Sequence, residues 1–389
     1  MEHILGKGIE VIILGLLTSF FVVILSMPAL IKVAYLKGLI DKPDDDRKLH
    51  KKSVPAMGGI IIFAGTLFAY FLWYPFSTIT EYSHLISAIN DFKFIGASML
   101  ILFFIGVKDD IVGTAATKKL IGHLIVAFIL VLMADIRITG LRGIFGVHEI
   151  PYYASVLLSI FTYTVIVNAF NLIDGVDGLA AGVGTIACTA FGIWFYLAGG
   201  IEMSILAFAL SGSLLGFLVF NFYPAKIFMG DSGSLTIGLI ISVLSIKLIE
   251  FNMEDAPSLL IGISKPVFVM ACLVYPLIDT LRIFIYRTIK RVSPFSADRN
   301  HLHHRLIDLG LSDRKTVLIV YAYNMVIVSV AIISTPEPST ALFVVGGIAI
   351  LLAQVPFFFK KKKNRKPNLK VVSIDDKPEE KIKITVGSN

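Results

Sequence analysis

Acidic, amide and imidazole side chains gather in five short polar segments of this sequence, each at the end of a long apolar stretch. The five segments are LHKKSVPAMGG (49–59), VKDD (107–110), NAFNLIDGVDGLAAG (168–182), PAKIFMGDSGS (224–234) and DRNHLHHRL (298–306). Ionisable side chains next to lipid are costly and usually functional. Their repeated placement at the ends of apolar segments therefore raises the question of whether they converge on one site.

The first candidate pair is Asp109 and Asp110, which follow Lys108 at the end of an apolar run. Adjacent side chains point in different directions on a helix. At least one of the two carboxylates should face the interior of the bundle or a polar cleft, because a lipid-facing pair would be costly. A solvated helix end is the alternative interpretation.

The second candidate set is Asn171, Asp174 and Asp177, spaced three residues apart. On a helix, this spacing spreads the side chains over one broad face. Gly175 and Gly178 would let another group approach the backbone closely. An N-capping cluster for the next helix is the alternative, although two acids and an amide exceed what one cap requires.

Asp231 stands among small residues in FMGDSGS, just before another apolar run. This setting suits a metal–diphosphate site or a tight turn, because Mg²⁺ prefers one or two carboxylates with phosphate and water completing its octahedron. A simple aspartate cap of the next helix is the alternative. Phe228 fits either an interfacial aromatic residue or a stacking surface for a base.

The histidine run places His301, His303 and His304 between Arg299 and Arg305. No cysteine is nearby and the spacing is not that of common zinc motifs. Histidine and arginine together suit phosphate oxygens better, since arginine binds them bidentately. A solvated basic loop is the alternative.

Basic residues and one acid–base pair complete the inventory. Lys51 precedes PAMGG and Lys119 opens an apolar segment, and the positive-inside bias alone could explain both. Asp279 and Arg282 lie one turn apart beyond Pro276, which could kink the helix. The pair is interpreted as a structural ion pair.

The composition identifies an integral membrane protein. The mean hydropathy is +0.81 and only 16% of the residues are charged, against about 25% in soluble domains. We predict an all-α polytopic fold with about 11 transmembrane helices. The predicted spans are 9–33, 56–76, 92–107, 119–135, 152–169, 179–198, 204–222, 233–249, 266–286, 316–334 and 340–359.

The distribution of lysine and arginine predicts the orientation. With the N-terminus outside, most of the 35 basic residues fall in cytoplasmic loops and in the C-terminal segment. We therefore predict one membrane domain over 1–359 and a basic, disordered cytoplasmic tail over 360–389. All five polar segments then lie on the cytoplasmic side. The outer segment 136–150 is expected to form a small hairpin.

Taken together, the acids, lysines and histidines on one membrane face fit a divalent ion and a diphosphate. The net charge of +7 follows the membrane topology, so nucleic acid is not an expected partner. The absence of a Walker A sequence argues against ATP. Few charges lie at mid-span, which argues against ion-coupled transport; a transporter of a phosphorylated solute or lipid remains the alternative from a different class.

In these segments the sequence resembles the bacterial polyprenyl-phosphate N-acetylhexosamine-1-phosphate transferases. Those membrane enzymes move a sugar-1-phosphate from a UDP-sugar to undecaprenyl phosphate. The resemblance covers about residues 10–335 and is carried by NLIDGVDGLAAG, IFMGDSGS and HLHH. It implies an active site facing the cytoplasm at the bacterial inner membrane, a Mg²⁺ cofactor that Mn²⁺ could replace, and a plausible homodimer.

The resemblance also assigns roles to residues. It implies Asp109, Asp110 and Asp231 as catalytic, with Asp231 as the metal ligand. Phe228 would approach uracil. The remaining substrate-binding positions implied are Lys51, Lys119, Asn171, Asp174, Asp177, His301, His303, His304 and Arg305.

The histidine run and the eleventh span favour one branch of that family. DRNHLHHRL is similar to the branch that takes UDP-GlcNAc and begins O-antigen, common-antigen or teichoic-acid linkage synthesis. Arg305 would then contact the sugar or the phosphate. The peptidoglycan branch, which uses UDP-N-acetylmuramoyl-pentapeptide, is the alternative, since it carries the same acids with a different histidine run and ten helices.

Overall fold

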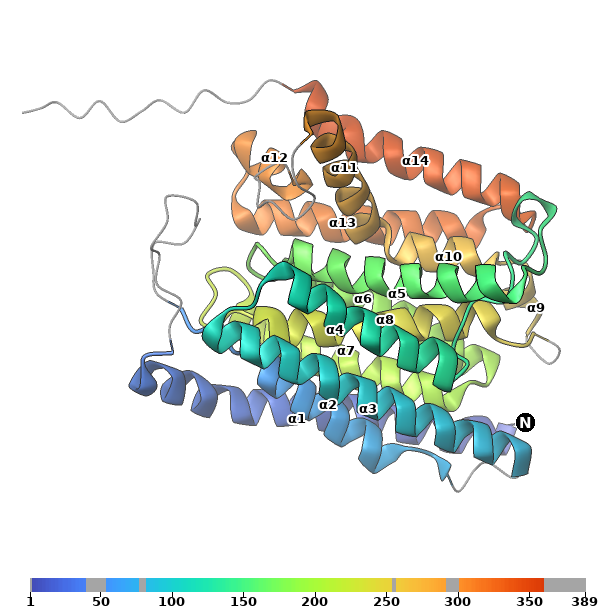
Figure 1. Ribbon diagram of the computed structural model, residues 1–389, viewed down its shortest axis with the longest axis horizontal. Helices are drawn as coiled ribbons and strands as arrows, with labels where there is room; N and C mark the ends of the chain where they lie inside the picture. The colour runs from blue at the N-terminus through green and yellow to red at the C-terminus, as the bar shows by residue number, and fades with distance from the viewer. Residues whose placement is uncertain (1, 40–53, 77–81, 254–256, 292–300, 360–389) are drawn as a thin grey trace, which may run out of the picture.

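The computed structural model describes residues 2–39, 54–76, 82–253, 257–291 and 301–359 (Figure 1). Lys51, Arg299 and the predicted tail over 360–389 lie outside the described residues. Within the described ranges the chain is helical and contains no β-strand, so the predicted all-α class is confirmed.

Most of the helices lie side by side along the long axis of the molecule (Figure 1). A five-residue π-helix, Ile129–Met133, continues α4, and a short 3₁₀ turn covers Ile144–Gly146. The α-helices are α1 (Glu2–Lys37), α2 (Gly59–Trp73), α3 (Tyr82–Val112), α4 (Ala116–Phe128), α5 (Tyr152–Ile173), α6 (Leu179–Ala198), α7 (Ile201–Asn221), α8 (Gly230–Glu250), α9 (Ser258–Ile261), α10 (Lys265–Cys272), α11 (Val274–Lys290), α12 (Leu302–Asp308), α13 (Asp313–Ile333) and α14 (Pro338–Phe358).

Each of the predicted spans is occupied by helix, but the spans differ in length. Eight helices among the described residues are long and apolar enough to cross a membrane. The helices α10 and α11 form a ninth if taken together, although they are bent by 76° at Leu273. The count of eleven from the sequence also included α2, which has only 15 residues, and α3.

Helix α8 lies at the centre of the bundle, and 94% of its 18-residue apolar stretch is buried. It packs against α2, α3, α5, α6 and α7. Small residues allow this close packing, as is common between membrane helices. A Cβ on Gly106 of α3 would lie 2.4 Å from Ser232 Cα, and a Cβ on Gly238 would lie 2.7 Å from Val167 Cα. The position of Asp231, at the N-terminus of α8, is therefore set by packing on several sides.

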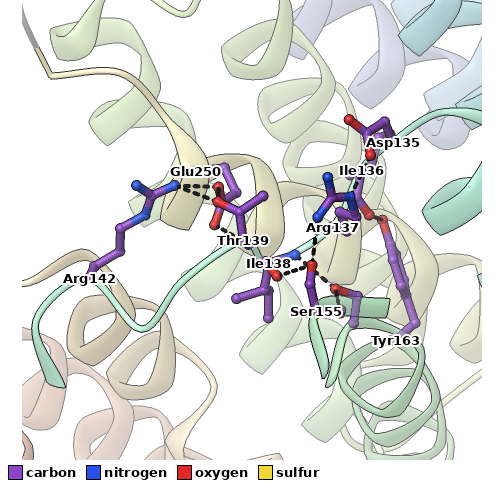
Figure 2. Close-up of polar contacts among 10 residues, drawn as sticks. Asp135, Ile136, Arg137, Ile138, Thr139, Arg142, Ser155, Tyr163 and Glu250 are labelled. Atoms are coloured by element: carbon purple, nitrogen blue, oxygen red, sulfur yellow. Dashed lines mark hydrogen bonds and ion pairs between the residues drawn. The ribbon is translucent and has the colours of Figure 1, made fainter. Parts of the chain in front are cut away.

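At the other end of α8, the connecting segment 134–150 is tethered by polar contacts (Figure 2). The Glu250 carboxylate accepts hydrogen bonds from the Thr139 amide at 3.0 Å and the Thr139 hydroxyl at 2.5 Å, and it pairs with Arg142. In the same view Arg137 donates to Asp135 at 2.5 Å and to Ser155 at 2.9 Å. These contacts tie the segment to α5 and α8.

The hairpin predicted for 136–150 is wrong in detail. Two backbone hydrogen bonds do close the segment, from Gly143 to Val147 and from Ile150 to Thr139, both at 3.0 Å. A 3₁₀ turn and side-chain bonds to Glu250 take the place of a strand ladder. The backbone donors are satisfied by tertiary contacts, which the local β-propensity could not reveal.

A largely buried ion pair joins α3 to α8 near this same end. Lys247 Nζ lies 2.5 Å from Asp91 Oδ2, with 25% and 12% of the two side chains exposed. Removing one member of a buried pair typically costs about 3–5 kcal/mol, whereas replacing both with apolar residues is often neutral. We expect Asp91→Leu to lower the free energy of unfolding by about 3 kcal/mol, measured by thermal unfolding in detergent.

The Asp91→Leu/Lys247→Met double variant tests this reason directly. It should recover most of the lost unfolding temperature, because no uncompensated charge remains. Lys93→Met, which alters an exposed lysine on the same helix, serves as the control. A double variant as unstable as the single one would contradict the ion-pair explanation.

Candidate active site

Four helices bring polar side chains together at one end of the bundle. They are the C-terminal ends of α3 and α5 and the N-terminal ends of α4 and α8. Consecutive helices alternate in direction, so these ends meet although they are far apart in the sequence. The residues that meet are Asp109, Asp110, Lys119, Asn171 and Asp231.

Asp231 is the centre of this cluster. Its Oδ2 lies 2.5 Å from Lys119 Nζ, and its Oδ1 accepts a hydrogen bond from Asn171 Nδ2 at 3.0 Å. Asn171 Nδ2 also donates to Ser234 Oγ at 3.0 Å. The carboxylate keeps 21% of its surface exposed. It is thus held in place on both oxygens and remains accessible from outside the bundle.

Lys119 links Asp231 to Asp109. Its ammonium group lies 2.7 Å from Asp109 Oδ2, and these two side chains are 20% and 16% exposed. The two neighbouring carboxylates stabilise the charged form of this lysine. The sequence left Lys119 open to explanation by membrane topology alone, whereas the structure places it between two of the predicted catalytic acids.

Asp110 has a different role from its neighbour. Its Oδ1 accepts from the Asp231 amide at 2.6 Å, and its Oδ2 accepts from the Ser232 amide at 3.1 Å and the Ser232 hydroxyl at 2.6 Å. A carboxylate on the first amides of a helix satisfies free donors and interacts favourably with the helix dipole. Asp110 of α3 therefore caps the N-terminus of α8 and fixes the backbone of Asp231.

The backbone around Asp231 is held by the PAMGG segment. The Phe228 amide donates to the Pro55 carbonyl at 2.7 Å, and the Gly58 amide donates to the Phe228 carbonyl at 2.9 Å. Gly230 has φ +74°, and a Cβ there would lie 2.6 Å from Asp110 Oδ1. Only glycine fits that position without strain. These contacts explain why the polar segments 49–59 and 224–234 both carry small residues.

Asp177 and Asn221 hold the loop that precedes FMGD. Asp177 Oδ2 accepts from the Ala225 amide at 2.9 Å. Asn221 accepts from the Gly178 amide and donates to the Ile227 carbonyl, both at 2.9 Å. Asp177 and Asn221 are both buried. Their contacts join the NLIDGVDG loop to the FMGD loop.

Asp174 is the least constrained acid of the group. Within the described residues its half-buried side chain has no hydrogen bond or ion pair, although it lies near Asp231, Asp110 and Asp177. Burial raises the pKa of Asp174 well above its usual range, and repulsion from those three carboxylates adds to the shift. A bound cation would reverse this effect, because it favours the ionised form. Asp174 and Asp231 are thus two neighbouring acids that could hold a divalent cation.

The histidine run lies against the NLIDGVDG loop. His303 Nε2 is 3.8 Å from the position that a Cβ on Gly175 would occupy. Burial lowers the pKa of His303 to about 3, so its ring is neutral at pH 7. The His301 and His303 rings stack at 5.2 Å between centroids with an interplanar angle of 12°. The histidine run thus adjoins the loop that carries Asp174.

Two predicted residues of the run are placed less centrally. Arg305 donates from Nη2 to the Phe359 carbonyl at 2.6 Å and from Nε to the Pro356 carbonyl at 3.3 Å. It therefore interacts with the C-terminal carbonyls of α14. His304 lies next to His303, with 4.3 Å between ring centroids.

Sequence reasoning missed two residues of α11. The predicted ion pair between Asp279 and Arg282 is present at 3.9 Å, but it is not the shortest contact of Asp279. Its short contacts are instead His301 Nδ1 and the Leu302 amide, both at 2.7 Å. Tyr275 contacts His303 Nδ1 at 2.9 Å. In the sequence, only the spacing of four between Tyr275 and Asp279 indicated that the two side chains share one face of a helix.

One further group offers ligand atoms for a metal. Side-chain atoms of Asp279, His301 and His303 all lie within 4.8 Å of one another, and all three residues are buried. The Asp279–His301 separation of 2.7 Å is that of a hydrogen bond. The hydrogen bonds already present explain the cluster without an ion.

Comparison with known proteins places these residues in a family. The family described as glycosyl transferase family 4 matches residues 92–249. A probable undecaprenyl-phosphate N-acetylglucosaminyl 1-phosphate transferase of Bacillus subtilis is 31% identical over 353 residues, covering 88% of this chain and 90% of the relative.

Two further relatives carry related names. The decaprenyl-phosphate N-acetylglucosaminephosphotransferase of Mycolicibacterium smegmatis is 34% identical, covering 80% of this chain and 79% of the relative. An undecaprenyl-phosphate alpha-N-acetylglucosaminyl 1-phosphate transferase of Salmonella typhi is 29% identical, covering 90% and 88%. The chain therefore belongs to glycosyl transferase family 4, together with these polyprenyl-phosphate N-acetylglucosaminyl 1-phosphate transferases.

Proposed function

We propose that the protein transfers N-acetylglucosamine-1-phosphate from UDP-GlcNAc to undecaprenyl phosphate and releases UMP. The product would be undecaprenyl-diphospho-GlcNAc, the starting lipid for a cell-envelope polysaccharide. The observation that carries this proposal is the meeting of Asp109, Lys119, Asn171 and Asp231 from four helices. The names of the relatives support the same substrates.

The reaction needs no strong base. An oxygen of the lipid phosphate attacks the sugar-bearing β-phosphorus, and the bond from that phosphorus to the bridging oxygen of UMP breaks. A phosphate monoester has a second pKa of about 6, so the acceptor is mostly dianionic at neutral pH. The task of the protein is therefore to position two anions and to stabilise the charge that develops between them.

The residues of the cluster divide this task. Lys119 lies where a cation could face phosphate oxygens, and Asp109 holds its ammonium group. Asp110 builds the α8 N-terminus, and both of its oxygens already accept hydrogen bonds. This engagement supports a single displacement over an aspartyl-phosphate intermediate at Asp110. UMP exchange into UDP-GlcNAc without any lipid phosphate would contradict the single displacement.

The donor set fits Mg²⁺, with Mn²⁺ as a substitute. Asp231 and Asp174 would hold the ion through hard carboxylate oxygens. Burial raises the pKa of Asp174, repulsion from the neighbouring carboxylates raises it further, and a bound cation would offset both effects. When bound, the ion would neutralise charge on the diphosphate and on the departing UMP. Asn171 orients Asp231 for this role through its hydrogen bond of 3.0 Å.

The proposal also assigns further residues to the substrates. Phe228 is proposed to stack on uracil. Lys51 and the three histidines are proposed to bind phosphate oxygens, and Asp177 holds the loop that adjoins His303. Arg305 is proposed to contact the sugar or the phosphate, which would require it to leave the carbonyls of α14.

The setting of the reaction follows the distribution of charge. We propose that the acid cluster faces the cytoplasm at the bacterial inner membrane, with the N-terminus outside. The predicted eleven-span topology and a homodimer are part of this proposal. The branch using UDP-GlcNAc is favoured over the one using UDP-N-acetylmuramoyl-pentapeptide, since the relatives compared are named for N-acetylglucosamine.

One assay tests the proposed function. Purified protein in detergent with Mg²⁺ and undecaprenyl phosphate should release UMP from UDP-GlcNAc, more slowly from UDP-GalNAc, and not from UDP-N-acetylmuramoyl-pentapeptide. Chelation with EDTA should abolish release, because the charge of the diphosphate is then no longer neutralised. Adding Mg²⁺ back should restore release. Flux of a phosphorylated solute in proteoliposomes with no UMP release would favour a transporter instead.

A further inference from the structure

Helix α11 lies at a steep angle to most of the other helices, at the side of the bundle formed by α12 and α13 (Figure 1). It begins at the bend of 76° after α10. Tyr275 and Asp279 lie one turn apart on α11 and are both buried. The bend directs this buried face towards the histidine run, which follows α11 in the sequence.

Each of these two side chains binds the same ring atom of a different histidine. Asp279 Oδ2 lies 2.7 Å from His301 Nδ1, and the Tyr275 hydroxyl lies 2.9 Å from His303 Nδ1. Asp279 Oδ1 also accepts from the Leu302 amide at 2.7 Å. The carboxylate thus fixes both the His301 ring and the first turn of α12.

These contacts favour one position of the proton on each ring. An ionised carboxylate only accepts, so His301 must donate from Nδ1. Within the described residues the Tyr275 hydroxyl has no other acceptor, so donation to His303 Nδ1 satisfies it. A neutral His303 then carries its proton on Nε2. That nitrogen lies 3.8 Å from the Cβ position of Gly175, in the loop that carries Asp174.

We propose that Tyr275 and Asp279 are positioning residues that hold His303 and His301 by Nδ1, so that the Nε2–H of His303 donates to a phosphate oxygen of the nucleotide sugar. The inference rests on the proposed function, because the phosphate is that of UDP-GlcNAc. Stacking of the two rings at 5.2 Å transmits the restraint on His301 to His303. The bend in α11 thereby places Tyr275 and Asp279 where they hold the two histidine rings in this orientation.

A double-mutant cycle tests Tyr275. Tyr275→Phe should lower kcat for UMP release by about 10- to 100-fold with little change in KM for UDP-GlcNAc, as expected when an orienting partner is lost. In a His303→Ala background the same substitution should have no further effect. Tyr286→Phe, at an exposed position of the same helix, is the matched control and should retain full activity.

Asp279→Asn should behave in the same way towards His301. It should lower kcat in the wild type and cost nothing more in a His301→Ala background. Asp135→Asn, which alters an exposed acid far from the histidine run, is the control. An equal fold-loss in both backgrounds, for either residue, would show that it acts on folding alone and would overturn the proposal.

A spectroscopic measurement separates this inference from the proposed function. With ¹⁵N-labelled histidine, the His303 signal, assigned by its loss in His303→Ala, should report the Nε2–H tautomer and change in Tyr275→Phe. That result would uphold the orienting role even if wild-type protein released no UMP, in which case the proposed function alone would fail. An unchanged tautomer, or one bound transition-metal ion per chain that is lost in Asp279→Asn, would overturn the inference.

Discussion

Asp231→Asn is expected to abolish turnover while the protein still folds. The substitution keeps an oxygen that can accept from Asn171 Nδ2, now 3.0 Å from Asp231 Oδ1, and Lys119 keeps its contact with Asp109. What is lost is the negative charge that pairs with Lys119 and would hold Mg²⁺. We expect UMP release to fall by about 1,000-fold or more, at the upper end of the cost of removing one electrostatic contact.

The measurement compares initial rates of UMP release with thermal unfolding of the same preparations in detergent. The unfolding temperature should change little, since Lys119 keeps Asp109 as an acceptor and Asn171 keeps the remaining oxygen of residue 231. Ser234→Ala is a useful control, because it removes only the second acceptor of Asn171. Wild-type turnover in Asp231→Asn at saturating Mg²⁺ would refute the central place of this carboxylate.

Asp109 and Asp110 are expected to respond differently to the same change. In Asp110→Asn the new amide group would face the Ser232 amide or hydroxyl, which need an acceptor. An unsatisfied buried donor costs about 1–3 kcal/mol. We therefore expect a lower unfolding temperature together with a large loss of turnover, because the α8 N-terminus shifts and carries Asp231 with it.

Asp109→Asn should instead reduce turnover without destabilising the protein. Its contact with Lys119 at 2.7 Å is partly exposed, and an amide oxygen can still accept from the ammonium group. We expect turnover to fall by about 10- to 100-fold, as for the loss of an orienting partner. The unfolding temperature should change no more than it does for an ordinary surface substitution. Matching losses of stability in the two variants would contradict this division of roles.

Much of the site was predictable because its members lie in short polar segments within an apolar sequence. Asp109, Lys119, Asn171 and Asp231 were all candidates, and the structure brings them together. Helix in every predicted span follows from the need to satisfy backbone groups in lipid. The number of full spans was not predictable in the same way, because α10 and α11 bend by 76° within one apolar run and α2 has only 15 residues.

The roles of neighbouring acids were not predictable. Nothing in the dipeptide Asp109–Asp110 indicates that one binds a lysine and the other caps a helix 121 residues away. Asp279 was assigned to Arg282 because they are local neighbours, but its hydrogen bonds go to His301 and Leu302. Local spacing favours partners within one helix, while burial decides which donors must be satisfied.

The sequence by itself determined that this is a helical membrane protein, where its polar chemistry is concentrated and which family it resembles. Those properties depend on hydropathy and on short motifs, both of which are local. The tertiary structure alone decided that Lys119 bridges Asp109 and Asp231, that Asp110 builds the α8 N-terminus and that α11 orients the histidines. These contacts join residues up to 122 positions apart, so they exist only when the helices pack side by side.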